Sequence, residues 1–136
     1  LHWAYDDDMD MNQSIAVIMC DLNGLKKIND SLGHPAGDKY ICDAAEILVS
    51  CFDDQNVYRV GGDEFIIVLQ GITKADLTIR TDRLQLYADL KKISLSFGVS
   101  YRTNSKEHFE TLLREADKKM YVQKKHYYEN LSLSRE

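Results

Sequence analysis

The sequence predicts one α/β (α+β) domain, in which helices flank a central mixed or antiparallel sheet. Three observations predict this class. A nearly unbroken apolar run fills 15–20, as in a central strand that is covered on both faces. Two strand-like runs within 56–69 meet at a glycine pair, which is typical of a β-hairpin. Segments with helical spacing separate the strands, and 136 residues are enough for a single core.

Composition and charge exclude several classes of protein. Hydrophobic residues make up 44% of the chain and charged residues 29%, as in ordinary globular proteins. The formal net charge is −5 and there is no basic stripe, which argues against binding to nucleic acid or to an anionic membrane. No apolar stretch approaches the roughly 20 residues that span a bilayer, and no signal peptide is recognised. We therefore expect a cytoplasmic segment, although a longer protein that contains it could be membrane-anchored.

The domain is expected over 15–128. Residues 1–14 then form a residual N-terminal helix or linker of a longer protein, and 129–136 form a C-terminal tail. The three cysteines lack the paired spacing of zinc sites, so buried and reduced thiols are expected at Cys20, Cys42 and Cys51.

The first half of the domain contains one strand and two helices. The strand at 15–22 leads into a short helix at 25–32, which Gly33 ends because glycine tolerates the left-handed conformation. Pro35 fits the start of the next helix, which runs to about Cys51. The positions of that helix expected to face the sheet are Tyr40, Ile41, Ala44, Ala45, Leu48 and Val49.

The second half begins with the hairpin at 56–69 and continues as helix, strand and helix. A helix is expected over 74–92, with Leu77, Leu84, Leu86 and Leu90 as its apolar positions. The alternation in 93–101 predicts a strand with one buried face. A last helix is expected over 106–128, and its inner stripe would be Phe109, Leu112, Leu113, Ala116, Met120 and Tyr121.

Acidic residues lie at the ends of two expected strands. Asp21 ends the run that starts at 15, and Asp63 and Glu64 follow the turn glycines Gly61 and Gly62, which we expect to supply the positive φ of a tight hairpin. A solvated acidic turn is the simplest interpretation of this tip. If the two strands are neighbours, however, the three carboxylates converge and form a site for Mg²⁺ or Mn²⁺.

These residues also resemble a known family. Gly61-Gly62-Asp63-Glu64-Phe65 is similar to the signature that names the GGDEF domain family, the diguanylate cyclases. Four further segments resemble family motifs in family order: Asp21 to Asp30, Gly33 to Asp38, Ser96 to Ser100, and Ala116 to Tyr121. The resemblance implies a ferredoxin-like βαββαβ palm core, similar to the palm domains of nucleotide cyclases and polymerases.

The resemblance also implies an activity, which is the condensation of two GTP into cyclic di-GMP with release of two pyrophosphates. A dimer of GGDEF domains would perform it, by metal-assisted attack of a ribose 3′-hydroxyl on an α-phosphate. By the same resemblance Asp63 and Glu64 are catalytic and ligate the metal, Asp21 ligates it through its side chain, and Leu22 through its backbone carbonyl.

Substrate-binding residues are implied in the same way. Asn29 and Asp38 match the pair that reads guanine, since a carboxylate can accept from the N1–H and the N2 amine together. His34 would lie near the substrate, although a histidine packed on a helix-terminal turn is an equally good interpretation. Lys26 would contact phosphate, although a lone lysine after a strand is more often simply solvated. Lys124 is implied as a further substrate-binding residue.

The chain departs from the family pattern at several places. Asn23 stands where many members have a second aspartate, and the segment after Lys124 lacks an arginine that could support a triphosphate. An R-x-x-D product site would occupy 52–55, where the chain has Phe52 and Gln55, so no inhibitory product site is expected.

Two alternative functions remain from the sequence. One is a catalytically weak GGDEF domain that acts as a GTP-binding regulatory or interaction module of a larger signalling protein with an upstream sensor domain. The other, a cyclase that makes a monomeric cyclic nucleotide, is disfavoured by the segment from Gly33 to Asp38.

Overall fold

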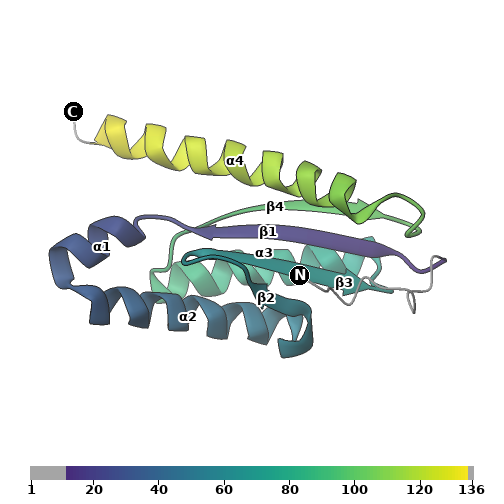
Figure 1. The fold of residues 1–136 in the computed structure, drawn as a ribbon, viewed down its shortest axis with the longest axis horizontal. Helices are drawn as coiled ribbons and strands as arrows, with labels where there is room; N and C mark the ends of the chain where they lie inside the picture. Colours follow the sequence, from purple (N-terminus) through teal and green to yellow (C-terminus); the bar gives the residue numbers. More distant parts are fainter. Residues whose placement is uncertain (1–11, 135–136) are drawn as a thin grey trace.

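A computed structural model describes residues 12–134. Most of the expected N-terminal helix or linker therefore lies outside the described residues. The elements, in chain order, are β1 (Ile15–Leu22), α1 (Leu25–Leu32), α2 (His34–Phe52), the 3₁₀ turn η1 (Asp54–Asn56), β2 (Val57–Arg59), β3 (Glu64–Gln70), α3 (Lys74–Lys91), β4 (Leu95–Arg102) and α4 (Phe109–Ser134) (Figure 1). The predicted order of strands and helices is confirmed. Residues 129–134 of the expected C-terminal tail form the last part of α4.

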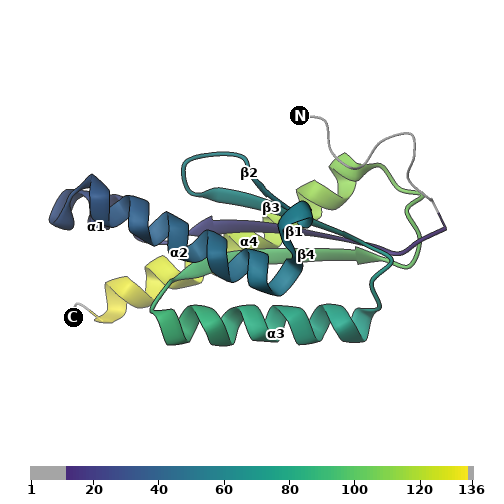
Figure 2. The same cartoon turned by 90° about the horizontal axis from the view of Figure 1, so that it is seen from below.

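The four strands form one antiparallel sheet in the order β2-β3-β1-β4. This is the strand order of the ferredoxin-like core that the resemblance implied. Figures 1 and 2 show α4 on one face of the sheet and α2 and α3 on the other, with α1 beyond the end of β1. Among the described residues, no helix is long and apolar enough to cross a membrane.

Successive side chains of β1 point to alternate faces of the sheet and so contribute to two separate hydrophobic clusters. The strand is buried along its whole length, as the apolar run predicted. Its even-numbered side chains pack with α2 and α3, in the cluster that includes Ile18, Leu48 and Leu84. Its odd-numbered side chains pack with α4, in the cluster that includes Val17 and Leu112. Successive side chains of a strand point to opposite faces, so one strand serves both clusters.

The prediction that β4 has one buried face is incomplete, because α4 covers the other face. Ser96 and Ser100 are each 1% exposed, and Gly98 lies between them on the same side. The Ser100 hydroxyl donates to the Leu112 carbonyl at 2.7 Å. A Cβ on Gly98 would overlap the Ala116 carbonyl, so α4 can lie this close only because the strand carries glycine there.

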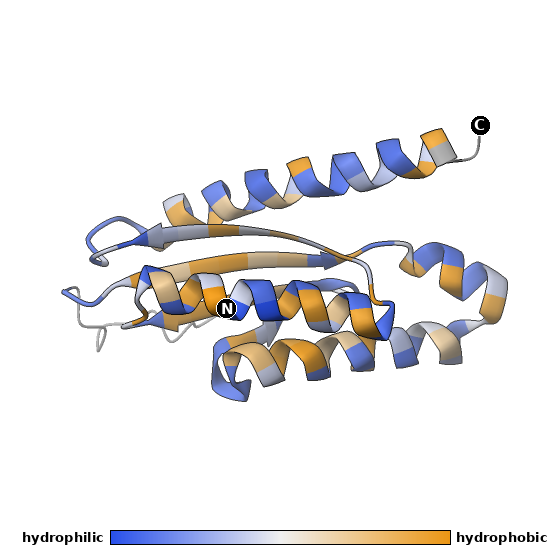
Figure 3. Cartoon of the chain, turned by 180° about the vertical axis from the view of Figure 1, so that it is seen from behind, coloured by the Kyte–Doolittle hydropathy of each residue, from blue (hydrophilic) through white to orange (hydrophobic). Residues whose placement is uncertain are grey.

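Several side chains expected to be apolar contacts are exposed instead. Leu86 and Leu90 are 55% and 71% exposed on α3, and Tyr121 is 64% exposed on α4. Figure 3 shows hydrophobic and hydrophilic residues alternating along α2 and α3. The buried stripe of α2 includes Ile47, which the sequence analysis omitted, and leaves Val49 only partly buried. Amphipathic spacing identified the helices but not the limits of each buried face.

The cysteines also differ from expectation at one position. Cys20 and Cys51 are buried, whereas Cys42 is exposed on α2, and all three are free thiols. Burial raises the pKa of the Cys20 thiol to about 12. Cys42 is exposed because the buried stripe of α2 passes through Ala44 and Ile47 on the opposite side.

We predict that Gly98→Ala destabilises the domain by about 1–3 kcal/mol, because overpacking a tight contact costs that much. The added methyl would meet backbone atoms of α4, which cannot turn aside as a flexible side chain can. Urea unfolding measures the loss. Gly62→Ala is the matched control, since a Cβ there has no atom within 4 Å. Equal unfolding midpoints for the two variants would contradict the close contact.

Candidate functional site

Three carboxylates meet where β1 and β3 pair. The register sets Asp21 opposite Glu64, and the Leu22 amide donates to the Asp63 carbonyl at 2.9 Å, which extends the pairing by one residue. One oxygen from each of Asp21, Asp63 and Glu64 lies within 4.8 Å of the others. The convergence expected from neighbouring strands is therefore present. Asp21 itself lies within β1, and it is 7% exposed.

The tip of the hairpin is held by Arg59, a residue to which the sequence analysis gave no role. Its guanidinium donates to the Gly61 carbonyl at 3.1 Å and to the Gly62 carbonyl at 2.8 Å. The Val60 amide donates to the Glu64 carbonyl at 3.0 Å and closes the base of the connection. These bonds fix the backbone that carries Asp63. Arg59 directly precedes the signature, but nothing in its spacing distinguishes it from a solvated strand residue.

The expectation that Gly61 and Gly62 supply positive φ is wrong. The described glycines with positive φ are Gly24, Gly33 and Gly71. Four residues connect β2 to β3, so the connection does not need the two-residue turn that requires such angles. A Cβ at Gly61 would make ordinary contacts with Glu64, and one at Gly62 would meet nothing within 4 Å. The space beside Gly62 is therefore open.

Lys124 reaches the carboxylates from α4. The buried stripe of that helix passes through Leu112, Ala116 and Met120, and Lys124 is one turn further along. On β1, Asp21 is the next position of the stripe that faces α4. The Lys124 Nζ donates to Asp21 Oδ2 at 2.6 Å and lies 3.5 Å from the Leu22 carbonyl oxygen. The apolar contact between α4 and β1 therefore ends in a contact between the Lys124 ammonium and the Asp21 carboxylate.

The cluster is electrostatically unfavourable without a further cation. Burial raises the pKa of Asp21, and the hydrogen bond from Lys124 opposes this rise only in part. Burial also raises the pKa of Glu64, and the negative charges of Asp21, Asp63 and Asp117 add to that rise. The second oxygen of Asp21, Oδ1, is buried and has no hydrogen-bond partner. Such an oxygen is available to a ligand.

Asn23 is turned away from this cluster and into a buried polar network. Its Nδ2 donates to Ser94 Oγ at 3.1 Å, and its Oδ1 accepts from Ser96 Oγ at 3.1 Å. Its carbonyl accepts from the Tyr40 hydroxyl at 3.0 Å. Asn23 is 2% exposed. The residue that replaces the family's second aspartate thus anchors the segment that follows β1.

The residues expected to read the base lie apart from the carboxylates, on α1 and α2. Asn29 is half-buried on α1, and Asp38 and His34 are exposed in the first turns of α2. A Cβ on Gly37 would overlap the Asn29 amide, which therefore lies directly on the Gly37 backbone. Gly37 directly precedes Asp38, so this contact brings the Asn29 amide beside Asp38 in the chain. Gly37 belongs to the motif-like segment from Gly33 to Asp38, and the match of that segment to the family motif could have identified it.

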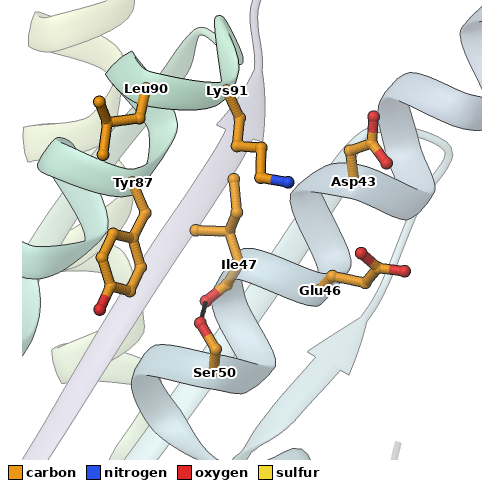
Figure 4. Close-up of a pocket in the computed structure, with 7 residues that line it drawn as sticks. All are labelled: Asp43, Glu46, Ile47, Ser50, Tyr87, Leu90 and Lys91. Carbon is orange, nitrogen blue, oxygen red and sulfur yellow. Dashed lines mark hydrogen bonds between the residues drawn. The ribbon is translucent and has the colours of Figure 1, made fainter.

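Two cavities lie beside the helices of the domain. A cavity of about 570 Å³ opens between α1 and the end of α4. It is lined by Gly24, Lys26, Lys27, Asp30, Tyr127, Tyr128, Leu131 and Ser132. A second cavity, of about 310 Å³, lies between α2 and α3. Figure 4 shows its lining, which includes Ile47, Tyr87 and Lys91 and none of the expected site residues.

The chain matches known proteins along nearly its whole length. Residues 2–130 match the family described as "Diguanylate cyclase, GGDEF domain". The chain is 29% identical over 133 residues to diguanylate cyclase A of Treponema denticola, a match that covers 90% of this chain and 36% of that protein. It is 34% identical over 119 residues to the cyclic di-GMP phosphodiesterase PdeB of Shewanella oneidensis, with 77% and 13% covered.

A solved structure shows the same fold. It is the active GGEEF domain of a diguanylate cyclase from Vibrio cholerae, with a TM-score of 0.71 and 30% identity. The match covers 84% of this chain and 78% of that chain. The present chain spans 36% and 13% of the lengths of the two curated relatives, which are much longer proteins.

We predict that Asn23→Ala lowers the free energy of unfolding by about 1–3 kcal/mol, because it leaves the buried Ser96 hydroxyl without its acceptor. Urea unfolding provides the measurement. Asn130→Ala, on an exposed part of α4, is the control and should change stability by less than about 0.5 kcal/mol. Similar losses in both variants would show that the network contributes nothing.

Proposed function

Because the chain belongs to the GGDEF domain family, we propose that it is a diguanylate cyclase domain that condenses two GTP into cyclic di-GMP and releases two pyrophosphates. The observation that carries the proposal is the buried Asp21 carboxylate. One oxygen of this carboxylate lacks a hydrogen-bond partner. The carboxylate also offers an oxygen that lies within 4.8 Å of an oxygen of Asp63 and of Glu64. A domain that only bound partners through its surface would have no physical need for this cluster.

The donor set fits Mg²⁺ or Mn²⁺. Carboxylate oxygens of Asp21, Asp63 and Glu64 are hard ligands of the kind these ions prefer. The Leu22 carbonyl oxygen would be a further ligand, since it lies on the same side of the strand end as Lys124 Nζ. The unpartnered Asp21 Oδ1 also supports the fit, because a bound cation would satisfy it.

The bound cation would lower the pKa of the attacking ribose 3′-hydroxyl and offset charge that develops on the α-phosphate. Asp63 would accept the hydroxyl proton, and Glu64 would assist beside it. Both side chains are held by the hairpin tip, which Arg59 fixes through two backbone carbonyls. The open space above Gly62 leaves room for the reacting groups.

Guanine would be recognised by Asn29 and Asp38. Asp38 can accept from N1–H and the N2 amine together, and Asn29 can complement the N3 edge. Adenine lacks the N2 amine and presents an acceptor at N1, so a bound adenine would cover the exposed Asp38 carboxylate without pairing with it, and a covered unpaired group costs about 1–3 kcal/mol. Lys26 and Lys124 would contact phosphate, and His34 would lie near the substrate. The cavity beside Lys26 offers space next to the segment that follows β1.

Turnover would require two domains. Each chain has one carboxylate cluster and one base-reading pair, whereas the product joins two GTP symmetrically. Two sites must therefore face each other across a two-fold axis. A longer protein with an upstream sensor domain would control this pairing.

A second candidate function is a GTP-binding regulatory module with little turnover. The similarity to PdeB favours it, because the matched part is 13% of a protein named for the opposite reaction. The segment after Lys124 reads Lys125-His126-Tyr127-Tyr128 and lacks the arginine that family members often have there, which favours weaker phosphate binding. Turnover of GTP by the purified chain distinguishes the two candidates.

We predict that the purified chain forms cyclic di-GMP from GTP with Mg²⁺, and that Asp63→Asn lowers turnover at least about 100-fold, because the cation loses a ligand and the hydroxyl its base. Stability should be unchanged or higher, since one repulsive charge is removed. Product separation by chromatography measures turnover, with ATP as the competing substrate. The exposed Asp82→Asn on α3 is the control. Unchanged turnover in Asp63→Asn would contradict the assignment.

We predict that the rate per chain rises with protein concentration, because the reaction needs two facing domains. A dilution series of the purified chain at saturating GTP and Mg²⁺ tests this. Size-exclusion chromatography over the same range should show dimer and activity increasing together. A constant rate per chain across the series would show that one domain suffices.

We predict that cyclic di-GMP inhibits only by competing with GTP. Phe52 is 0% exposed in the core, and Gln55 cannot supply a charge. The nearby Arg80 is paired with Asp76 at 3.1 Å and lies 3.6 Å from Asp53. Neither end of the motif therefore supplies an arginine fork to grip the product's phosphates, and Arg80 is already engaged by carboxylates. Steady-state kinetics with added product at several GTP concentrations gives the pattern. A non-competitive pattern at low micromolar product would contradict the prediction.

A further inference from the structure

Lys124 contacts two groups that the proposed cation would also use, the Asp21 carboxylate and the Leu22 carbonyl. Its Nζ lies 2.6 Å from Asp21 Oδ2 and 3.5 Å from the Leu22 carbonyl oxygen. Both contacts come from the end of β1, where the carboxylates meet. An ammonium and a divalent cation on the same carboxylate repel each other, and solvent screens this repulsion weakly because Asp21 is buried.

The pair between Lys124 and Asp21 differs from the other ion pairs of residues 12–134. It is the shortest of them, and it is also the most buried, with side chains that are 22% and 10% exposed. The pairs on Arg80, Arg102 and Lys39 are longer and each has a more exposed side chain. Screening by solvent is therefore weakest at Lys124, and its hydrogen bond is of the charge-assisted kind.

The position of Lys124 follows from packing and not from a flexible side chain that happens to reach a carboxylate. Met120, one turn before it, is 6% exposed and is packed against β1 residues. Gln123, directly before it, accepts from the Phe97 amide at 2.9 Å and ties α4 to β4. The helix therefore presents Lys124 to Asp21 in a fixed register.

We propose that Lys124 is a resident counter-ion of the cation site, which holds Asp21 Oδ2 and the Leu22 carbonyl in the nucleotide-free domain and weakens the binding of a divalent cation there until it moves away. This inference rests on the proposed function. Phosphates of a bound nucleotide offer Lys124 a different anion, so they remove its competition with the cation. Divalent cation and nucleotide then bind with positive coupling, in which each increases the affinity of the other by the same factor.

The test measures Mn²⁺ binding without turnover. Free Mn²⁺ is followed by electron paramagnetic resonance for the whole chain, without nucleotide, at one pH and one ionic strength. We expect Lys124→Met to bind Mn²⁺ at least about tenfold more tightly than wild type, as removal of a charge-assisted hydrogen bond to a metal ligand allows. Lys124→Gln, which is uncharged but still polar, should shift the affinity in the same direction if the methionine variant folds poorly.

Lys125→Met is the matched control. It removes the same charge one residue further along α4, where the side chain is exposed, and should change Mn²⁺ affinity less than about twofold. In a second arm, a non-hydrolysable GTP analogue should tighten Mn²⁺ binding by wild type and by Lys125→Met. The same analogue should tighten binding by Lys124→Met much less.

Two results would overturn the counter-ion role. One is a Lys124→Met affinity for Mn²⁺ equal to or weaker than that of wild type. The other is equal tightening by nucleotide in wild type and in Lys124→Met. A different failure is recognised separately: if Asp21→Asn and Asp63→Asn bind Mn²⁺ as tightly as wild type, the cation site itself is refuted, and the counter-ion role with it.

Discussion

The close contact between α4 and the sheet is the constraint on which the candidate site depends. Gly98 lets the backbone of α4 approach the sheet, and Ser100 bonds the Leu112 carbonyl at 2.7 Å. Further along, Lys119 donates to the Val99 carbonyl at 3.0 Å, and Gln123 accepts from β4 at 2.9 Å. These contacts fix the distance of α4 from the sheet and its position along β4. They also occupy hydrogen-bonding groups of an edge strand that could otherwise pair with another chain.

Burial gives the carboxylate cluster its chemistry. β1 is covered on both faces, so Asp21 leaves water on folding, and its pKa rises. A charge in this position is costly unless a cation offsets it. Lys124 offsets part of the cost in the described structure, and the proposed divalent ion would offset more. The domain therefore retains a locally unfavourable group at the place where it is proposed to react, and the apolar clusters on both sides of the sheet stabilise the fold around it.

The two proposed tasks of the site are assigned to different parts of the fold. The carboxylates belong to the rigid centre of the sheet, where neighbouring strands fix them. The residues proposed to read guanine belong to α1, which Figure 1 shows beyond the end of β1, and to the first turns of α2. Gly37 brings those helices together so closely that the Asn29 amide lies on its backbone. Base selectivity could therefore change through α1 and α2 while the metal chemistry in the sheet stays the same.

The sequence by itself determined the order of elements and the buried central strand, because alternation and turn position are local properties of the chain. It predicted that Asp21, Asp63 and Glu64 converge only if their two strands are neighbours, and the pairing of β1 with β3 decided that. It did not determine that Leu86 and Tyr121 are exposed, since helical spacing does not show how wide the buried face of each helix is. Only the tertiary structure decided that Lys124 meets Asp21. The two residues are 103 positions apart, and their contact depends on how deeply α4 packs on the sheet, for which no nearby residue gives a signal.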